Sequence, residues 1–324
     1  TGVRELFIAS DTDTKQADDI TANVPKFIPA NVHKLSSATT ENILVALSSD
    51  EDNALYVYQY YVAQNRRLQS AWHKWTYGST STDNILNVDF IENELFLVNE
   101  RSDGVYLEKI NISPALTDTG ESYLTHLDRK LNNTEITEAY NAGTNQTTIT
   151  LPYQIKNNMK VVGRSGASNK AGQAITIVSQ TVGGTDIVIS GDITAQNYFV
   201  GEQYEFKFVF SQQFIQTADT QGSRISVKEG RLQIRNWNVS FNYTGFFTTE
   251  VQPVGRDLST STFTGTITGT GLLGTVNLED GDFTFAVQSE NDKLTVTIKN
   301  DSHLPSNFIN ASWQGYYVTA SSRV

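Results

Sequence analysis

The stretch that most constrains the fold is residues 230–247, with the sequence GRLQIRNWNVSFNYTGFF. Apolar and polar residues alternate along it, which is typical of a long β-strand. The phase changes halfway, because Leu232 and Ile234 share one parity and the later apolar residues share the other. The later set comprises Trp237, Val239, Phe241 and Tyr243. A strand cannot turn both sets toward one core without a β-bulge or strong twist, so we expect one near Asn236.

Most other periodic segments also repeat every second residue, as half-buried antiparallel strands do. Residues 55–62 alternate in this way. So do Phe206, Phe208 and Phe210, hereafter the phenylalanine row, with Glu205 and Lys207 on the opposite face. Further alternating sets are Phe283, Phe285 and Val287, and Leu294, Val296 and Ile298. No segment keeps a helical period over more than three turns, and the best candidate, 134–142, is short and polar. The class predicted is therefore all-β.

Short polar or glycine-containing pairs separate the apolar runs. Three pairs are typical of hairpin turns: Asp103-Gly104, Gly183-Gly184 and Asp280-Gly281. Two others, Glu92-Asn93 and Asn291-Asp292, are polar breaks. This spacing of turns supports a succession of short antiparallel strands.

The length suits two or three domains, and we divide the chain into four parts. Residues 1–40 look irregular, and 41–130 contain two sets of strands about 42 residues apart, close to the repeat of a propeller blade. Residues 131–225 read as an inserted small β domain, and 226–324 as a C-terminal antiparallel β-sandwich. Two propeller-like blades cannot close a ring. Together with the first residue, Thr1, this predicts a longer protein of which the chain is the C-terminal piece.

Composition excludes several classes of site. The chain has no cysteine, so disulfides, thiolate zinc sites and cysteine nucleophiles are excluded. No two of the four histidines have metal-ligand spacing, and we expect no cofactor. The net charge of −11 disfavours binding of nucleic acid through its phosphates. The same charge suits a channel wall that repels DNA phosphates and lets the duplex pass unbound. No run of 18 apolar residues or signal peptide is visible, which predicts no membrane insertion.

Candidate catalytic motifs are weak, and we predict no enzyme. Arg164-Ser165-Gly166 approaches a nucleophile elbow but lacks the last glycine, so Ser165 is better explained as a flexible loop residue. Three other patterns are better explained as turns or as a surface pair, and a fourth begins like a calcium loop but lacks the glycine and glutamate that such a loop requires. They are the glycine-rich 269–274, Ser102-Asp103-Gly104, the His126 and Asp128 pair, and Asp11-Thr12-Asp13.

Aromatic residues are concentrated near position 60. Tyr56, Tyr58 and Tyr60, hereafter the tyrosine row, share one strand face, and Trp72 and Trp75 follow. If the opposite face packs inside, the row is exposed and is a candidate protein or sugar contact. The alternative is a strand buried on both faces, and the sequence leaves both open.

Several stretches, in the same order, resemble the nozzle family (tail tubular protein B) of autographivirus-type short-tailed phages. They extend from about residue 55 to the end of the chain, and the family's protein is much longer. Residues 131–225 match no motif of the family. The matching stretches are Tyr56-Val57-Tyr58, Gln69 to Trp75, Gly104 to Ile110, Leu127 to Lys130, Gly230 to Phe247 and the C-terminal Ser312-Trp313-Gln314-Gly315-Tyr316-Tyr317.

The resemblance implies a structural protein of the virion tail, assembled in the host cytoplasm. Six copies would form a ring beneath the adaptor (tail tubular protein A), extend the DNA channel and help to anchor the tail fibre proteins. DNA would pass through without specific binding, and inner loops would gate it. As a candidate channel or gate loop we take Arg164, Ser165, Gly166 and Lys170.

Two other functions stay open. A carbohydrate-binding or depolymerising tail component would line an exposed groove with the tyrosine row, or with Trp72 and Trp75, beside paired carboxylates. A generic β-rich adhesin is the third possibility, and the missing cysteines and signal sequence weigh mildly against it.

Overall fold

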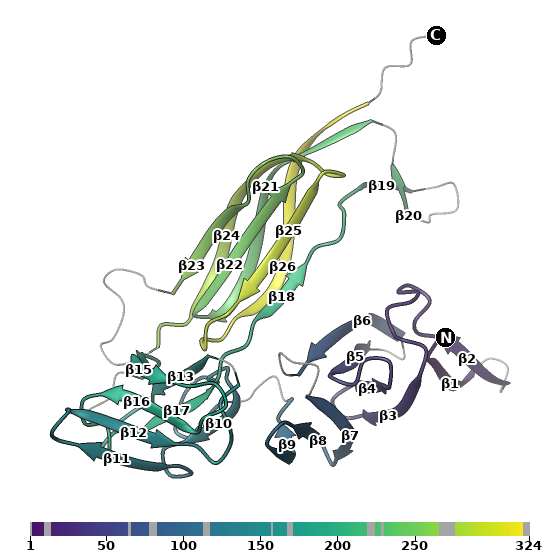
Figure 1. Ribbon diagram of the computed structural model, residues 1–324. Coiled ribbons are helices and arrows are strands. Elements are labelled where there is room, and N and C mark those ends of the chain that lie inside the picture. Colours follow the sequence, from purple (N-terminus) through teal and green to yellow (C-terminus); the bar gives the residue numbers. More distant parts are fainter. Residues whose placement is uncertain are drawn as a thin grey trace, which may run out of the picture. The chain divides into compact units, whose positions relative to one another are not determined.

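A computed structural model describes residues 2–9, 14–63, 66–77, 83–112, 117–156, 158–166, 171–218, 224–227, 230–265 and 276–319. Within this part of the chain every regular element is a β-strand, which confirms the all-β prediction (Figure 1). No helix there has the length and apolarity needed to cross a bilayer. The chain divides into two compact units, Thr1–Leu116 and Thr117–Val324. The predictions on Asp11-Thr12-Asp13, 269–274 and Lys170 lie outside the described residues.

The first unit consists of one hairpin and two antiparallel meanders. The hairpin pairs β1 (Arg4–Ala9) with β2 (Thr14–Asp19). The four-stranded meander contains β3 (Val32–Ala38), β4 (Ile43–Ser48), β5 (Ala54–Ala63) and β6 (Arg66–Thr76). The three-stranded meander contains β7 (Asn84–Ile91), β8 (Glu94–Arg101) and β9 (Gly104–Ile110). Residues 1–40, expected to be irregular, therefore contain three strands.

The two meanders share one hydrophobic core. Val45 and Leu55 of the four-stranded sheet pack with Val88 and Leu97 of the three-stranded sheet, and all four are buried. The opposite face of β4 and β5 is also covered, by Ile28, Val32 and other residues of a second cluster. Strand β5 therefore lies between two apolar layers.

The second unit begins with two four-stranded sheets. The first has the order β10-β17-β13-β14, and the second β11-β12-β16-β15. Their strands are β10 (Asp128–Asn132), β11 (Thr137–Asn141), β12 (Gln146–Thr150), β13 (Met159–Gly163), β14 (Ala174–Ile175), β15 (Ile177–Gln180), β16 (Asp186–Ser190) and β17 (Tyr198–Glu202). Ile149, Ile187, Val161 and Val200 are fully buried in these sheets. Their alternating apolar residues account for the burial.

The C-terminal part of this unit has two longer sheets, ordered β18-β25-β22-β23 and β24-β21-β26 (Figure 1). Their strands are β18 (Phe206–Val209), β21 (Arg231–Thr244), β22 (Phe246–Pro253), β23 (Ser259–Thr264), β24 (Glu279–Glu290), β25 (Leu294–Asn300) and β26 (Asn307–Val318). One core joins the two sheets, with Trp237 and Val239 from β21 meeting Phe247 and Ile298 from the other sheet. A small hairpin, β19 (Ile215–Ala218) with β20 (Arg224–Val227), adjoins them.

The phase change in β21 is resolved by a bulge where the sequence predicted one. The pairing with both neighbours shifts register between Ile234 and Asn236. As a result Leu232, Ile234 and Trp237 all enter the same core. The prediction for Tyr243 is wrong. A second register shift, after Phe241, leaves Tyr243 66% exposed with a φ of 46°.

Three further expectations need correction. Asp280-Gly281 is not a hairpin turn, because it lies inside β24. The segment 206–209 was placed in the inserted domain, but it pairs with β25 of the C-terminal sheet. The phenylalanine row is not uniformly buried, since Phe206 and Phe208 are 40% and 50% exposed. Strand β18 is an edge strand, so a neighbouring strand covers it on one side only.

Candidate functional site

The tyrosine row is largely internal. Tyr56 and Tyr58 are buried, and Tyr60 is half-buried. The structure therefore supports the alternative of a strand buried on both faces at the first two positions. The other candidates, Trp72 and Trp75, are half-buried on β6. A contact role for the exposed parts of these side chains stays a prediction.

The aromatic rings form a continuous stack across β5 and β6. The ring centroid of Tyr58 lies 5.6 Å from that of Tyr60 and 4.9 Å from that of Trp72. The guanidinium of Arg67 lies 5.9 Å from both tyrosine rings, within range of a cation–π interaction. The indole Nε1 of Trp72 donates to the carbonyl of Ile20 at 2.9 Å, which fixes the ring. These four residues (Tyr58, Tyr60, Arg67, Trp72), hereafter the aromatic band, are in mutual contact.

A carboxylate anchors the hydroxyl of Tyr56, the first member of the tyrosine row. Glu51 accepts hydrogen bonds from the Tyr56 hydroxyl and from Lys74 Nζ. The bond from Lys74, followed by that from Tyr56, lowers the pKa of Glu51. Burial, followed by the bond to Glu51, raises the pKa of Tyr56. Tyr56 therefore stays a neutral donor, and we assign it a structural role.

The first two residues of the candidate gate loop, Arg164 and Ser165, form hydrogen bonds with the segment around Glu121. Arg164 donates to the carbonyl of Thr119 at 2.7 Å, and its guanidinium lies 4.5 Å from the Phe199 ring centroid. The backbone N–H and the hydroxyl of Ser165 both donate to Glu121, at 2.8 and 2.5 Å. Ser165 lies outside the strands, in a loop as predicted, and its hydrogen bonds connect that loop to Glu121. Gly166 is exposed, and the role of this loop as a gate stays a prediction.

The histidine predicted to pair with Asp128 has another ring partner. His126 Nδ1 lies 2.9 Å from the Tyr204 hydroxyl, and its backbone N–H donates to the carbonyl of His303 at 2.9 Å. Nε2 of His303 lies 2.7 Å from the carbonyl oxygen of Gly172. Burial is the largest influence on both histidines and lowers the pKa of each. Their contacts join the first sheets of this unit to its C-terminal sheets.

Two motifs that the sequence showed as separate stretches lie side by side. Trp237 of β21 is paired with Trp313 of β26, and Gly315 faces the bulge in β21. A methyl group at Gly315 would overlap the backbone carbonyl of Gln233. The bulge residue Arg235 donates to the Tyr316 hydroxyl at 2.9 Å. The C-terminal motif is therefore the partner strand that the bulge requires.

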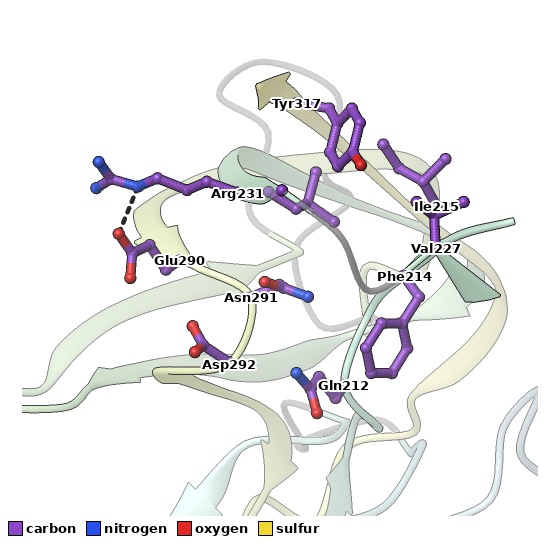
Figure 2. Close-up of a pocket in the computed structure, with 11 residues that line it drawn as sticks. Gln212, Phe214, Ile215, Val227, Arg231, Glu290, Asn291, Asp292 and Tyr317 are labelled. Atoms are coloured by element: carbon purple, nitrogen blue, oxygen red, sulfur yellow. Dashed lines mark ion pairs between the residues drawn. The ribbon is translucent and has the colours of Figure 1, made fainter. Parts of the chain in front are cut away.

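A pocket of about 530 Å³ lies where these motifs end, and sequence reasoning did not identify it (Figure 2). Segments far apart in the chain form it, so no local pattern indicates it. The only signal was the Asn291-Asp292 break, interpreted as a turn. The lining residues are Gln212, Phe214, Ile215, Val227, Gly230, Arg231, Leu232, Glu290, Asn291, Asp292 and Tyr317.

Among the described residues, no group of three or more histidine, aspartate or glutamate side chains could hold a metal ion. The hydroxyl of Ser165 donates to the carboxylate of Glu121, which also accepts its backbone N–H. The prominent surface features of the described residues are the exposed apolar strand edges and the pocket.

Comparison with known proteins adds a family. A model of the bacteriophage nozzle protein family matches residues 1–324. The chain is also similar to the tail tubular protein gp12 of Escherichia phage T7, with 26% identity over 332 residues. That match covers 100% of this chain and 41% of the relative, so the chain spans less than half of the relative's length.

Proposed function

Because this chain belongs to the bacteriophage nozzle protein family, we propose that it is a structural subunit of a phage tail nozzle. The subunits form a ring in the virion tail that extends and gates the DNA-ejection channel and helps to anchor tail fibres. The observation that carries this proposal is the family match over the whole chain. The all-β construction, with several small sheets and exposed apolar residues on their edge strands, is compatible with an assembly subunit.

The charge of the chain suits the passage of DNA. The net charge is −11, and like charge repels phosphate groups over roughly a Debye length, about 8 Å at physiological salt. A wall of this sign gives DNA no tight binding sites. The duplex then passes the ring without specific contacts, and gating is a matter of loop position. We keep Arg164, Ser165 and Gly166 as a candidate gate loop, held in place by Glu121.

The subunit contacts are supported by one edge of the C-terminal sheets. The edge strands β18 and β26 lie close together, since the rings of Phe206 and Phe308 stack with centroids 5.9 Å apart. Phe208 and Ile309 are 50% and 65% exposed on these strands. Exposed apolar edge strands are prone to pair with another chain. A ring needs a heterologous contact, so we propose that this edge meets a different face of the next subunit.

Electron-microscope class averages of the purified protein, in the longest form that its gene encodes, test this proposal. A six-fold ring with a central hole is the expected result. Dispersed monomers at the same concentration would contradict it. Phe208→Lys should abolish the ring, whereas Val254→Lys, at an apolar position in the loop after β22 that is 73% exposed, should leave it intact. Rings that survive Phe208→Lys would remove the β18 edge from the interface.

A further inference from the structure

The pocket at the end of the C-terminal sheets plays no part in the proposed structural role. It lies between the β19–β20 hairpin, the start of β21 and the turn from β24 to β25 (Figure 2). Its volume of about 530 Å³ is within the range of small-molecule sites, roughly 300–1,000 Å³. The size suits one or two sugar rings.

One wall of the pocket is apolar and partly aromatic. It contains Phe214, Ile215, Val227, Leu232 and Tyr317. Ile215, Val227 and Tyr317 come together on one side of the cavity in Figure 2. Aromatic rings of this kind offer a flat apolar face. A pyranose ring presents a matching face of C–H groups, so it can stack on such a wall.

The opposite wall is polar and carries uncharged amides. The Asn291 side chain is held in place, because its backbone N–H donates to Leu232 O at 3.0 Å and its Nδ2 donates to Gln213 O at 2.7 Å. Within the described part of the chain, the side chains of Gln212 and Asp292 make no hydrogen bond. Amide and carboxylate groups together offer donors and acceptors suited to sugar hydroxyls.

The charges select among ligands. Arg231, the cation in the lining, is paired with Glu290, and Lys293 Nζ lies 2.5 Å from the same carboxylate. Asp292 adds a further negative charge without an ion pair among the described residues. Because Arg231 is already paired with Glu290, an anionic group such as phosphate or a uronate would have to compete with that carboxylate for the cation. A neutral or amino sugar meets no such penalty.

From these walls and charges we infer that the pocket binds a neutral or amino pyranose unit of a saccharide. The apolar wall holds the C–H face of the ring, and Gln212, Asn291 and Asp292 bind the hydroxyl or amino groups. This site is a binding activity and involves no bond cleavage. It does not depend on ring formation, which electron microscopy tests separately.

Saturation-transfer NMR on the full 324-residue chain tests the inference, with glucose, galactose, N-acetylglucosamine, glucosamine and glucuronate as the probes. We expect transfer to at least one neutral or amino sugar and none to glucuronate. Asp292→Ala and Tyr317→Ala should each weaken binding about tenfold or more, since each removes one wall's contact. Tyr317→Phe should retain most of the affinity, because the ring stays.

Asp301→Ala is the matched control. Asp301 is exposed and follows the end of β25, whereas Asp292 precedes its start, so both changes remove one surface carboxylate near the same strand. Asp301→Ala should bind like the parent. The inference is overturned if no probe binds at millimolar concentration, if glucuronate binds best, or if correctly folded Asp292→Ala and Tyr317→Ala bind like the parent.

Discussion

Strands β5 and β18 carry the same pattern, three aromatic residues at alternate positions, and have opposite surroundings. The first two members of the tyrosine row are 2% and 3% exposed, whereas the first two of the phenylalanine row are 40% and 50% exposed. Strand β5 is an interior strand with apolar clusters on both faces. Strand β18 is an edge strand. Phe210, just beyond its end, packs against the core, with its ring centroid 4.8 Å from that of Trp237.

The alternation of side chains along a strand fixes which residues share a face, but not which segments cover that face. Cover is supplied by segments distant in the sequence, such as Ile28 and Trp72 for β5. An aromatic row is therefore core on an interior strand and a contact surface on an edge. The same pattern supports stability in one unit and, in our proposal, assembly in the other.

The largest effect is expected inside the tyrosine row. Tyr58→Ala should lower the free energy of unfolding by about 3–5 kcal/mol, because it removes a buried ring stacked on two neighbours. Tyr61→Ala, on the same strand but 58% exposed, should change it by less than about 0.5 kcal/mol. Urea unfolding measures both. Equal effects would break the distinction between the buried first half of β5 and its more exposed second half.

An intermediate effect is expected at the bulge. Gly315→Ala should cost about 1–3 kcal/mol, since the added methyl collides with the backbone of Gln233. Gly281→Ala is the control within the same sheet, because its added methyl would lie 3.6 Å from the Phe241 ring, an ordinary contact. It should be nearly neutral in the same unfolding experiment. A neutral Gly315→Ala would show that β26 can shift to accommodate the bulge.

Acidification should destabilise the second unit through its buried histidines. Burial lowers the pKa of His126; the charge of Lys130 lowers it further, and that of Asp118 opposes the shift. Burial also lowers the pKa of His303, where the hydrogen bond to Gly172 opposes the shift and the charge of Lys160 adds to it. The unfolded chain therefore binds more protons than the folded chain near pH 6.5. Stability is complete above about pH 6.5 and falls as the pH drops through the lowered folded pKa values.

Thermal unfolding between pH 7.5 and pH 5 measures this loss. His126→Gln and His303→Gln should each flatten the pH dependence below about pH 6.5. His33→Gln, which changes an exposed histidine of β3, should leave the profile unchanged. A parent protein whose second unit is equally stable across this range would show that burial does not govern these two side chains.

The smallest effect on stability is expected in the phenylalanine row. Phe208→Ala should change the free energy of unfolding by less than about 1 kcal/mol, since half of the side chain is already exposed. A loss as large as that of Tyr58→Ala would show that the β18 edge is covered within the chain. Such a result would also remove the edge from the proposed subunit contact.

Parts of the candidate surfaces could be predicted, and other parts could not. The aromatic stack follows from the spacing of Tyr58 and Tyr60 on one strand and from pairing with the strand that carries Trp72. The anchoring of Ser165 by Glu121 could not be foreseen, because 44 residues separate the two. The pocket was equally hidden, since its walls come from four segments that meet only in the folded chain.

Local sequence pattern was enough to predict the class, the alternation of the strands and the bulge near Asn236. These are local properties, fixed by side chains within a few residues of one another and by the period-two geometry of a strand. The sequence also carried the motifs that resembled the family to which the chain belongs.

Four features could be read only from the folded chain: the burial of the tyrosine row, the exposure of Phe206 and Tyr243, the place of β18 in the C-terminal sheet, and the pocket. Each depends on which distant segment lies alongside, and a single sequence encodes such long-range pairing only through the sum of many weak contacts. Local pattern sets the faces of a strand, and the neighbours that the fold supplies decide whether a face is core, contact surface or binding site.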